Sequence, residues 1–260
     1  MRILLTNDDG IYAPGIEALE QELAQVGDVT VVAPATEQSG VGHAITFLSP
    51  LVCQEVYREK RFRGWSVEGS PADCVKLGVM ELCPDRPDLV VSGINNGLNT
   101  GINVLYSGTV AAAIEGAFFG VTSIAVSLEY DEHADWASAA RIARRLIESI
   151  LKNDANRPCG ASLFNVNIPT AALGGDPQVR VVPMGISRYG EGFVRRTDPQ
   201  GRRYFWATID PPPPDEPEQT DLNAIRRGHV TLTPLHFDLT RYDGLPTMRE
   251  WTFDLEEMVR

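Results

Sequence analysis

The sequence predicts an α/β protein with a Rossmann-like, mostly parallel sheet flanked by helices, followed by a β-rich C-terminal extension. Three observations support this fold class. Segments of strand and helix character alternate from the first residues to about Pro169. The 260 residues are 43% hydrophobic, which is enough to cover both faces of such a sheet. After Pro169, glycines, arginines and prolines accumulate, which marks a change in organisation.

The opening of the chain has the pattern of a βαβ unit. Residues 3–6 form a short apolar run, which is typical of a buried strand. Residues 15–26 carry apolar side chains at helical spacing, and Pro14 suits a first helical turn. Residues 28–33 are rich in β-branched side chains, as in a second strand. This order predicts two parallel strands joined by a right-handed crossover.

The next 140 or so residues continue the alternation and complete a predicted core domain of residues 1–170. Two weaker alternating segments, residues 51–56 and 63–67, are expected to pair antiparallel. Further helices are predicted at residues 71–82, 109–119 and 136–152, and further strands at 88–91, 121–128 and 162–168.

Residues 171–260 form the predicted extension, which we expect to be integrated with the core into one domain. Residues 203–208 and 230–233 have the character of hairpin arms lying outside the core. Residues 211–214 are four consecutive prolines, which favour an extended polyproline spacer. A final helix is predicted at residues 246–258.

Composition argues against several classes of protein. The net charge of −12 repels phosphate backbones and disfavours nucleic-acid binding. No run approaches the roughly 18 apolar residues of a membrane helix, and Asn7 ends the N-terminal apolar run too early for a signal peptide. We therefore expect a soluble cytoplasmic protein without a membrane partner. The cysteines form no CxxC pair, which disfavours a disulfide framework or a zinc site, and they are Cys53, Cys74, Cys83 and Cys159.

Two adjacent carboxylates, Asp8 and Asp9, follow the first predicted strand. In open α/β sheets, ligands bind at the carboxyl ends of the strands. A hard cation such as Mg²⁺ or Mn²⁺ seeks oxygen ligands and would relieve the repulsion between these carboxylates. The alternative is that one aspartate caps a helix and that Asp9 and Gly10 form a turn, and the pair alone leaves both open.

Neutral oxygen and amide groups follow two other strands, so they are expected at the same edge. Ser39 lies in the glycine-containing loop 37–43 and offers a neutral oxygen ligand. In the segment 92–99, Asn95 could place its carbonyl oxygen on a metal, and Asn99 could donate to a phosphate. The alternative is ordinary loop chemistry, since glycine, serine and asparagine build turns by themselves.

The start of a predicted helix at Ser107, Gly108 and Thr109 offers an anion site through its backbone N–H groups, its hydroxyls and the helix dipole. The alternative is that Ser107 or Thr109 only caps this helix. No P-loop lysine and no GxGxxG motif is present, so a nucleotide would be a substrate and not a dinucleotide cofactor. Together these groups predict metal-assisted phosphoester hydrolysis.

The sequence resembles the SurE (survival protein E) family of 5′/3′-nucleotidases over nearly its whole length. The matching stretches are TNDDGIYAPGI (6–16), EQSG (37–40), GSPADCV (69–75), SGINNGLNTG (92–101), YSGTVAAAIEG (106–116), FNVNIP (164–169), and TD with GHVTLTPLHFDLT (220–240). Two positions depart from the family pattern. Asn103 stands where an acidic residue is expected in some relatives, and His43 stands where a serine or an apolar residue is more common.

The resemblance implies a divalent-metal-dependent phosphomonoesterase acting on nucleoside 5′- and 3′-monophosphates, and for some members on short polyphosphate. It implies one Mg²⁺ or Mn²⁺ ion per subunit and a homodimer or homotetramer that exchanges C-terminal segments. The implied metal ligands are Asp8, Asp9, Ser39 and Asn95. The implied phosphate-binding residues are Asn99, Ser107, Gly108 and Thr109.

For the mechanism, we expect a metal-bound water to attack phosphorus in line, with Asp8 and Asp9 as catalytic ligands. Formation of an aspartyl-phosphate at Asp8 is the rival mechanism. His236 is a candidate acid for the leaving group, and its alternative is a surface or interface histidine. Four aromatic residues could stack on a base or pack between hairpin arms, and they are Tyr189, Tyr204, Phe205 and Trp206.

Two other functions remain compatible with the sequence. A nucleotide- or polyphosphate-sensing module with little turnover would need the same metal and anion groups. A hydrolase of a non-phosphate ester or amide would more often use histidine or cysteine metal ligands or a Ser-His-Asp triad, and no GxSxG motif is present.

Overall fold

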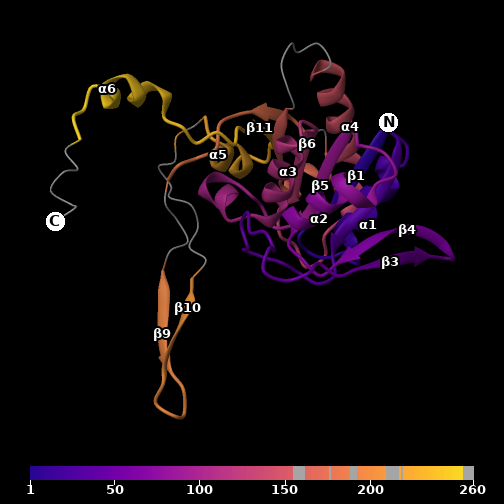
Figure 1. The fold of residues 1–260 in the computed structure, drawn as a ribbon, viewed down its shortest axis with the longest axis horizontal. Helices are drawn as coiled ribbons and strands as arrows, with labels where there is room; N and C mark the ends of the chain where they lie inside the picture. The colour runs from indigo at the N-terminus through magenta and orange to yellow at the C-terminus, as the bar shows by residue number, and fades with distance from the viewer. Residues whose placement is uncertain (155–161, 176, 188–191, 209–216, 218, 254–260) are drawn as a thin grey trace.

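The computed structural model of the protein describes residues 1–154, 162–175, 177–187, 192–208, 217 and 219–253. Within these residues, nine strands form one sheet (Figure 1). In spatial order they are β3 (Cys53–Arg58), β4 (Arg61–Val67), β2 (Asp28–Pro34), β1 (Arg2–Thr6), β5 (Leu89–Asn96), β6 (Thr122–Leu128), β7 (Leu163–Ile168), β11 (Val230–Pro234) and β8 (Val179–Val181). The strands from β4 to β7 are all parallel, which confirms the predicted mostly parallel α/β fold.

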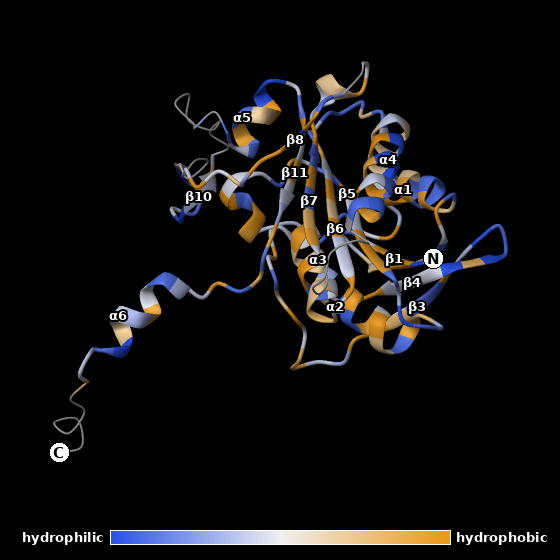
Figure 2. Cartoon of the chain, turned by 90° about the horizontal axis from the view of Figure 1, so that it is seen from above, coloured by the Kyte–Doolittle hydropathy of each residue, from blue (hydrophilic) through white to orange (hydrophobic). Residues whose placement is uncertain are grey.

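Helices cover both faces of the sheet, and the apolar strands lie between the two helical layers (Figure 2). The helices α1 (Pro14–Leu23) and α4 (Trp136–Asp154) pack on one face, and α2 (Pro71–Leu77) and α3 (Gly108–Phe118) on the other. Leu5 faces the first layer and its neighbour Leu4 faces the second, as the alternation of a strand requires. Both leucines are completely buried.

The chain reverses direction across the sheet at β1. After β1 it continues to β2 on one side, whereas β5 and β6 are added on the other side. The connecting helices α1 and α3 consequently lie on opposite faces. In a doubly wound sheet, this reversal opens a crevice outside the carboxyl ends of the two flanking strands, here β1 and β5.

Most predicted elements of residues 1–170 are confirmed, with shifted ends. The antiparallel pair of β3 and β4 is confirmed as well. The first helix ends at Leu23 instead of residue 26, and α2 ends at Leu77, followed by a wider helical turn up to Leu82. The strand β5 extends five residues beyond the predicted end, because Asn95 and Asn96 resume pairing with β6 after an irregularity.

The prediction that residues 230–233 form a hairpin arm outside the core is wrong. The strand β11 joins the main sheet, antiparallel to β7 and parallel to β8, and Val230 is fully buried. Its partner β7 lies some sixty residues earlier in the chain, so no local hairpin signal marks the pairing. The short helix α5 (Asp221–Arg226), capped by the side chain of Thr220, was not predicted.

The strands β9 (Phe193–Thr197) and β10 (Arg203–Ala207) form the expected hairpin, which projects from the body of the molecule (Figure 1). The final helix α6 (Leu245–Arg249) ends earlier than predicted, since residues 250–253 are not helical. Short 3₁₀ turns occur at Gly101–Leu105, Thr170–Ala172 and Tyr242–Gly244. Residues 211–214 and 254–258, Tyr189 and Cys159 lie outside the described residues.

Within the described part of the chain, no helix combines the length and the apolar character that crossing a membrane requires.

Candidate active site

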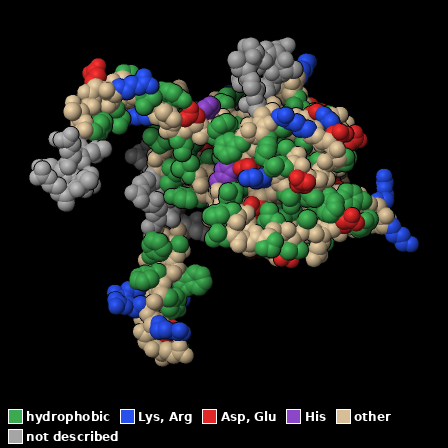
Figure 3. All heavy atoms as spheres, in the orientation of Figure 1, with side chains coloured by type: hydrophobic (Ala, Val, Ile, Leu, Met, Phe, Trp, Pro, Cys, Tyr) green, Lys and Arg blue, Asp and Glu red, His purple; other side chains and the backbone are tan. Residues whose placement is uncertain are grey.

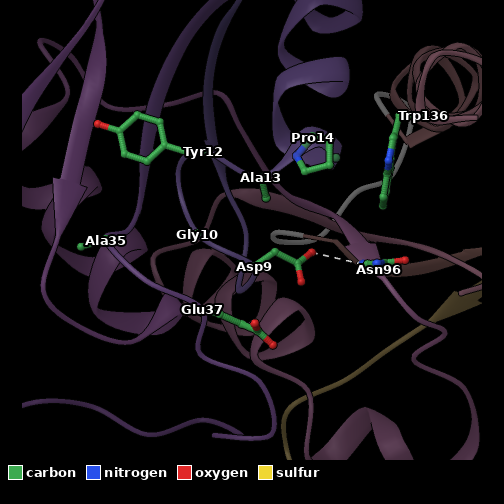
Figure 4. Close-up of a pocket in the computed structure, with 10 residues that line it drawn as sticks. Asp9, Gly10, Tyr12, Ala13, Pro14, Ala35, Glu37, Asn96 and Trp136 are labelled. Carbon is green, nitrogen blue, oxygen red and sulfur yellow. Dashed lines mark hydrogen bonds between the residues drawn. The ribbon is translucent and has the colours of Figure 1, made fainter. Parts of the chain in front are cut away.

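Asp8 and Asp9 lie at the crevice between β1 and β5. The carboxylate of Asp8, only 5% exposed, accepts the backbone N–H of Thr109 at 3.1 Å through Oδ2 and the hydroxyl of Thr109 through Oδ1. The carboxylate of Asp9 accepts the backbone N–H of Asn96 at 3.1 Å, as the dashed line in Figure 4 marks. One acid is thus fixed by the start of α3 and the other by the end of β5.

Hydrogen bonds from Thr109 and Asn96 stabilise the two carboxylates only in part. Burial raises the pKa of Asp8, and burial together with the charge of Asp8 raises the pKa of Asp9 to about 6. The carboxylate of Glu37 adds repulsion to both. Among the described residues, no lysine, arginine or histidine forms an ion pair with either aspartate. A cation is the missing partner that this charge distribution favours.

The start of α3 touches Asp8 because residue 108 is glycine. A Cβ at Gly108 would lie 2.9 Å from the Cβ of Asp8, too close for any other side chain. The hydroxyl of Ser107 accepts the N–H of Val110 at 3.0 Å, so Ser107 is the N-cap of the helix. With the amides of Thr109 and Val110 already bonded, the amide of Gly108 is the donor left at the positive end of the helix dipole.

The loop after β2 brings Ser39 to the same edge. The backbone N–H of Gln38 donates to the carbonyl of Asp8 at 2.7 Å, which ties the loop to the aspartate pair. The hydroxyl of Ser39 donates to Oε1 of Glu37 at 2.5 Å. Because the proton of Ser39 points to Glu37, the lone pairs of its oxygen are available to a metal ion.

The two asparagines predicted at the site have different surroundings. The amide nitrogen of Asn95 donates to the carbonyl of Gly97 at 2.6 Å, which leaves its amide oxygen as the group that could ligate. Asn99 is buried, and its side-chain nitrogen donates to Ser127 at 2.8 Å. Its backbone N–H donates to Asn167 at 2.7 Å. These bonds hold the loop before α3, and one N–H of the Asn99 side-chain amide is used for the bond to Ser127.

His236 contacts its own segment and a neighbouring aromatic cluster. The exposed ring accepts the N–H of Asp238 at 3.0 Å and stacks on Phe237. Phe237 meets Phe118 edge-on, and Phe118 stacks on His43. None of the contacts described for His236 joins it to Asp8 or Asp9.

The donor set fits a hard divalent ion. Among the described residues there is no cluster of three or more histidine, cysteine or acidic side chains that could hold a metal. The available set is two carboxylates and the neutral oxygens of Ser39 and Asn95, which suits Mg²⁺ or Mn²⁺ better than zinc.

Comparison with known proteins assigns the chain. The family described as "Survival protein SurE" matches residues 3–191. The chain belongs to the SurE family. Similar SurE proteins include the 5′-nucleotidase SurE of Rhodopirellula baltica, 59% identical over 96% of this chain and 98% of that protein. The 5′-nucleotidase SurE of Syntrophobacter fumaroxidans is 45% identical over 96% and 99% of the two chains.

A solved SurE structure has the same fold. The crystal structure of the SurE protein from Aquifex aeolicus aligns with a TM-score of 0.83 and 37% sequence identity, over 96% of this chain and 98% of that chain. The SurE resemblance predicted from the sequence motifs is confirmed, as is the fold class.

Sequence reasoning missed several residues that the SurE fold brings to the site. They are Glu37, which accepts a hydrogen bond from the Ser39 hydroxyl; Asn96, whose backbone N–H donates to Asp9; and the aromatic residues Tyr12 and Trp136. Glu37 had a usable signal, because it lies two residues from Ser39 in the same loop. Trp136 had none, since only the folded chain brings the start of α4 to the end of β1.

Proposed function

We propose that this SurE-family protein is a divalent-metal-dependent phosphomonoesterase that converts nucleoside 5′- and 3′-monophosphates to nucleoside and phosphate, with short polyphosphate as a further substrate. Membership of the family and the naming of its relatives confirm the predicted enzyme class, a 5′-nucleotidase. The single observation that carries the metal dependence is the uncompensated pair Asp8 and Asp9 beside the positive end of α3.

Asp8, Asp9, Ser39 and Asn95 would hold one Mg²⁺ or Mn²⁺ ion per subunit. When bound, the ion supplies an activated water and neutralises charge on the phosphate. The chain itself supplies the alignment. Thr109 donates hydrogen bonds to both oxygens of Asp8, and Glu37 accepts a hydrogen bond from the Ser39 hydroxyl, so both oxygen ligands are oriented before an ion binds.

The phosphate would bind at the start of α3, near Ser107, Gly108 and Thr109, with Asn99 in the loop before it. Support comes from the helix dipole and from the amide of Gly108, which suit an anion next to Asp8. We propose that the equatorial oxygens of the phosphate are stabilised there as charge builds up during in-line attack. His236 stays a candidate proton donor to the leaving group.

The proposed assembly is a homodimer or homotetramer. Large apolar side chains are exposed on the hairpin of β9 and β10 and around α6, and Figure 3 shows hydrophobic side chains along the hairpin. Examples are Phe193, Phe205, Trp206, Trp251 and Phe253. Exposed apolar patches of this kind mark protein contacts. We also propose a cytoplasmic location, in keeping with the free thiols of Cys53, Cys74 and Cys83.

The test is phosphate release from 5′-AMP, 3′-AMP and short polyphosphate, each with Mg²⁺, Mn²⁺ or EDTA. We expect turnover with metal, none with EDTA, and a loss of about a hundredfold or more in Asp9→Asn, because a metal ligand is removed. Glu81→Gln, which removes an exposed carboxylate far from Asp9 in sequence, is the matched control and should keep full activity.

Two outcomes would contradict the proposal. If a folded wild-type protein binds nucleotide but releases no phosphate with either ion, the sensing module is the better reading. If single-turnover hydrolysis in ¹⁸O-labelled water puts the label into a protein carboxylate and not into phosphate, the reaction proceeds through an aspartyl-phosphate at Asp8 instead of direct attack by water.

A further inference from the structure

A cavity of about 370 Å³ opens beside Asp9, on the α1 face of the sheet and therefore across from the start of α3 (Figure 4). Asp9 and Asn96, which follow β1 and end β5, both line it, so it lies in the crevice where the sheet order reverses. Its volume falls within the usual range of small-molecule sites. The lining residues are Asp9, Gly10, Tyr12, Ala13, Pro14, Gly15, Ala35, Glu37, Asn96 and Trp136.

Two aromatic side chains stand on different sides of this cavity (Figure 4). Trp136 is half-buried and packs against the first turn of α1, where a Cβ at Gly15 would lie 3.0 Å from the indole and 2.1 Å from the carbonyl oxygen of Ile94. Glycine is thus required for α1 to approach β5 and the indole so closely. Tyr12 is 73% exposed, and its ring points away from Asp9 in Figure 4, so a turn of this exposed side chain would bring its phenol over a ligand.

The side chains that line the cavity do not favour a second phosphate. Its acidic side chains are Asp9 and Glu37, and its described lining contains no lysine, arginine or histidine. Figure 4 shows both carboxylates at one end, below Ala13. A neutral group with hydroxyl donors fits such an end, since carboxylates accept hydrogen bonds from ribose hydroxyls. The rest of the lining is aromatic, apolar or glycine.

We infer that this cavity is the nucleoside subsite, with the base against Trp136 and Tyr12 and the ribose hydroxyls toward Glu37. The inference rests on the proposed phosphomonoesterase function, because it requires the phosphate to lie across Asp9 at the start of α3. It assigns base recognition to the start of α1 and α4, and not to the hairpin aromatics Tyr204, Phe205 and Trp206.

The test compares two esters that share the same sugar phosphate, 5′-AMP and ribose 5-phosphate, under the same Mn²⁺ concentration. Tyr12→Ala and Trp136→Leu should each lower kcat/KM for AMP about tenfold, as the loss of one base-stacking partner predicts, and change it less than about twofold for ribose 5-phosphate. Inhibition by adenosine should weaken by a similar factor. Tyr57→Ala, an exposed tyrosine on β3, is the matched control and should change neither ester.

Trp136 packs against α1, so Trp136→Leu can unfold the protein. In that case Tyr12→Ala, which changes a mostly exposed side chain, decides the test. Equal losses for both esters in Tyr12→Ala, or unchanged adenosine inhibition, would overturn the inference. So would a selective loss of AMP hydrolysis in Tyr204→Ala or Trp206→Leu, which would place the base on the hairpin. If the wild type hydrolyses neither ester, the proposed function itself fails, which is a separate result.

Discussion

Asp9 is a residue whose charge no cationic side chain of the described chain neutralises. Its carboxylate is half-buried beside the buried carboxylate of Asp8, and nothing positive in the described chain compensates the two charges. The fold holds them together through Thr109 and Asn96, which come from different elements. The fold therefore keeps the two carboxylates close together, and they repel each other when no metal ion is bound.

We predict that Asp9→Asn stabilises the metal-free protein at neutral pH. The pKa of Asp9 is raised to about 6, so the folded state binds a proton more tightly than the unfolded chain. The destabilisation of the folded state by the ionised Asp9 is absent well below the unfolded pKa of about 4 and is complete above about pH 6. After discounting for partial exposure, this destabilisation is about 1–2 kcal/mol. We therefore expect the Tm of the variant at pH 7.5 to be about 3–6 °C above that of the wild type.

Thermal unfolding in EDTA at pH 7.5 and pH 4 measures this difference. The gain should shrink toward zero near pH 4, where the wild-type carboxylate is protonated in the folded state and about half protonated in the unfolded chain. Added Mn²⁺ should reverse the order of the two proteins, because only the wild type keeps all four of the proposed metal ligands. A variant that melts below the wild type in EDTA at pH 7.5 would show that Asp9 is not under repulsion.

At this scale, the sequence revealed residues that follow strands and missed those that meet only in space. The place of Asp8, Asp9, Ser39 and Asn95 at one edge of the sheet could be predicted, because parallel strands bring their carboxyl ends to the same edge. Trp136 starts a helix some 125 residues after Asp9, so no spacing rule connects them. The roles within the predicted set were also finer than the sequence could indicate, since Ser107 caps α3 and Thr109 supports Asp8.

Among the elements, the loop after β2 depends on α3 for its position. Nε2 of His43 lies 2.8 Å from Oε2 of Glu115, a buried carboxylate in the middle of α3, and the imidazole stacks on Phe118. The same loop carries Ser39 and Glu37. The contact therefore links the predicted metal loop to the helix whose start is the predicted phosphate site.

We predict that His43→Ala lowers the free energy of unfolding by about 1–3 kcal/mol, because the carboxylate of Glu115 is left buried without its partner. Cleavage of the loop by a protease should become faster. His43→Gln, which can still donate to Glu115, should recover part of the loss. Urea unfolding measures the first effect, and His133→Ala, an exposed histidine, is the control. If His43→Ala and His133→Ala are equally stable, the contact between His43 and Glu115 does not stabilise the fold.

Element prediction succeeded where partners are close in sequence and failed where they are distant. The βαβ opening and the pair of β3 and β4 follow from local patterns. The sequence of β11 is β-branched, as a hairpin arm would be, so its composition does not distinguish the two cases. Its pairing with β7 places it in the main sheet. The helix α5 was missed because six residues are too few to show a helical period.

Across the whole molecule, the C-terminal extension is joined to the core through the loop before α3 and through the strand β7. The buried carboxylate of Asp221 accepts the backbone N–H of Gly101 at 2.8 Å, in the loop before α3, and that of Gly185 at 2.8 Å. The strand β11 covers the edge of β7, and Leu222 of α5 is buried. The hairpin of β9 and β10 differs, since within the described part of the chain its strands pair with each other and with no strand of the main sheet.

These contacts predict opposite results for two deletions. A chain ending at residue 170 would expose the unpaired edge of β7 and the apolar surface under α5, so we expect aggregation or no cooperative thermal transition. A chain in which a short Gly-Ser linker replaces residues 193–207 should keep a cooperative transition, because no ladder of the main sheet is lost. Calorimetry and far-UV circular dichroism, at equal protomer concentration, compare the two with the full chain. A cooperative, native-like transition in the 1–170 chain would mean that the core folds as a domain by itself and that β11 and Asp221 only dock onto it.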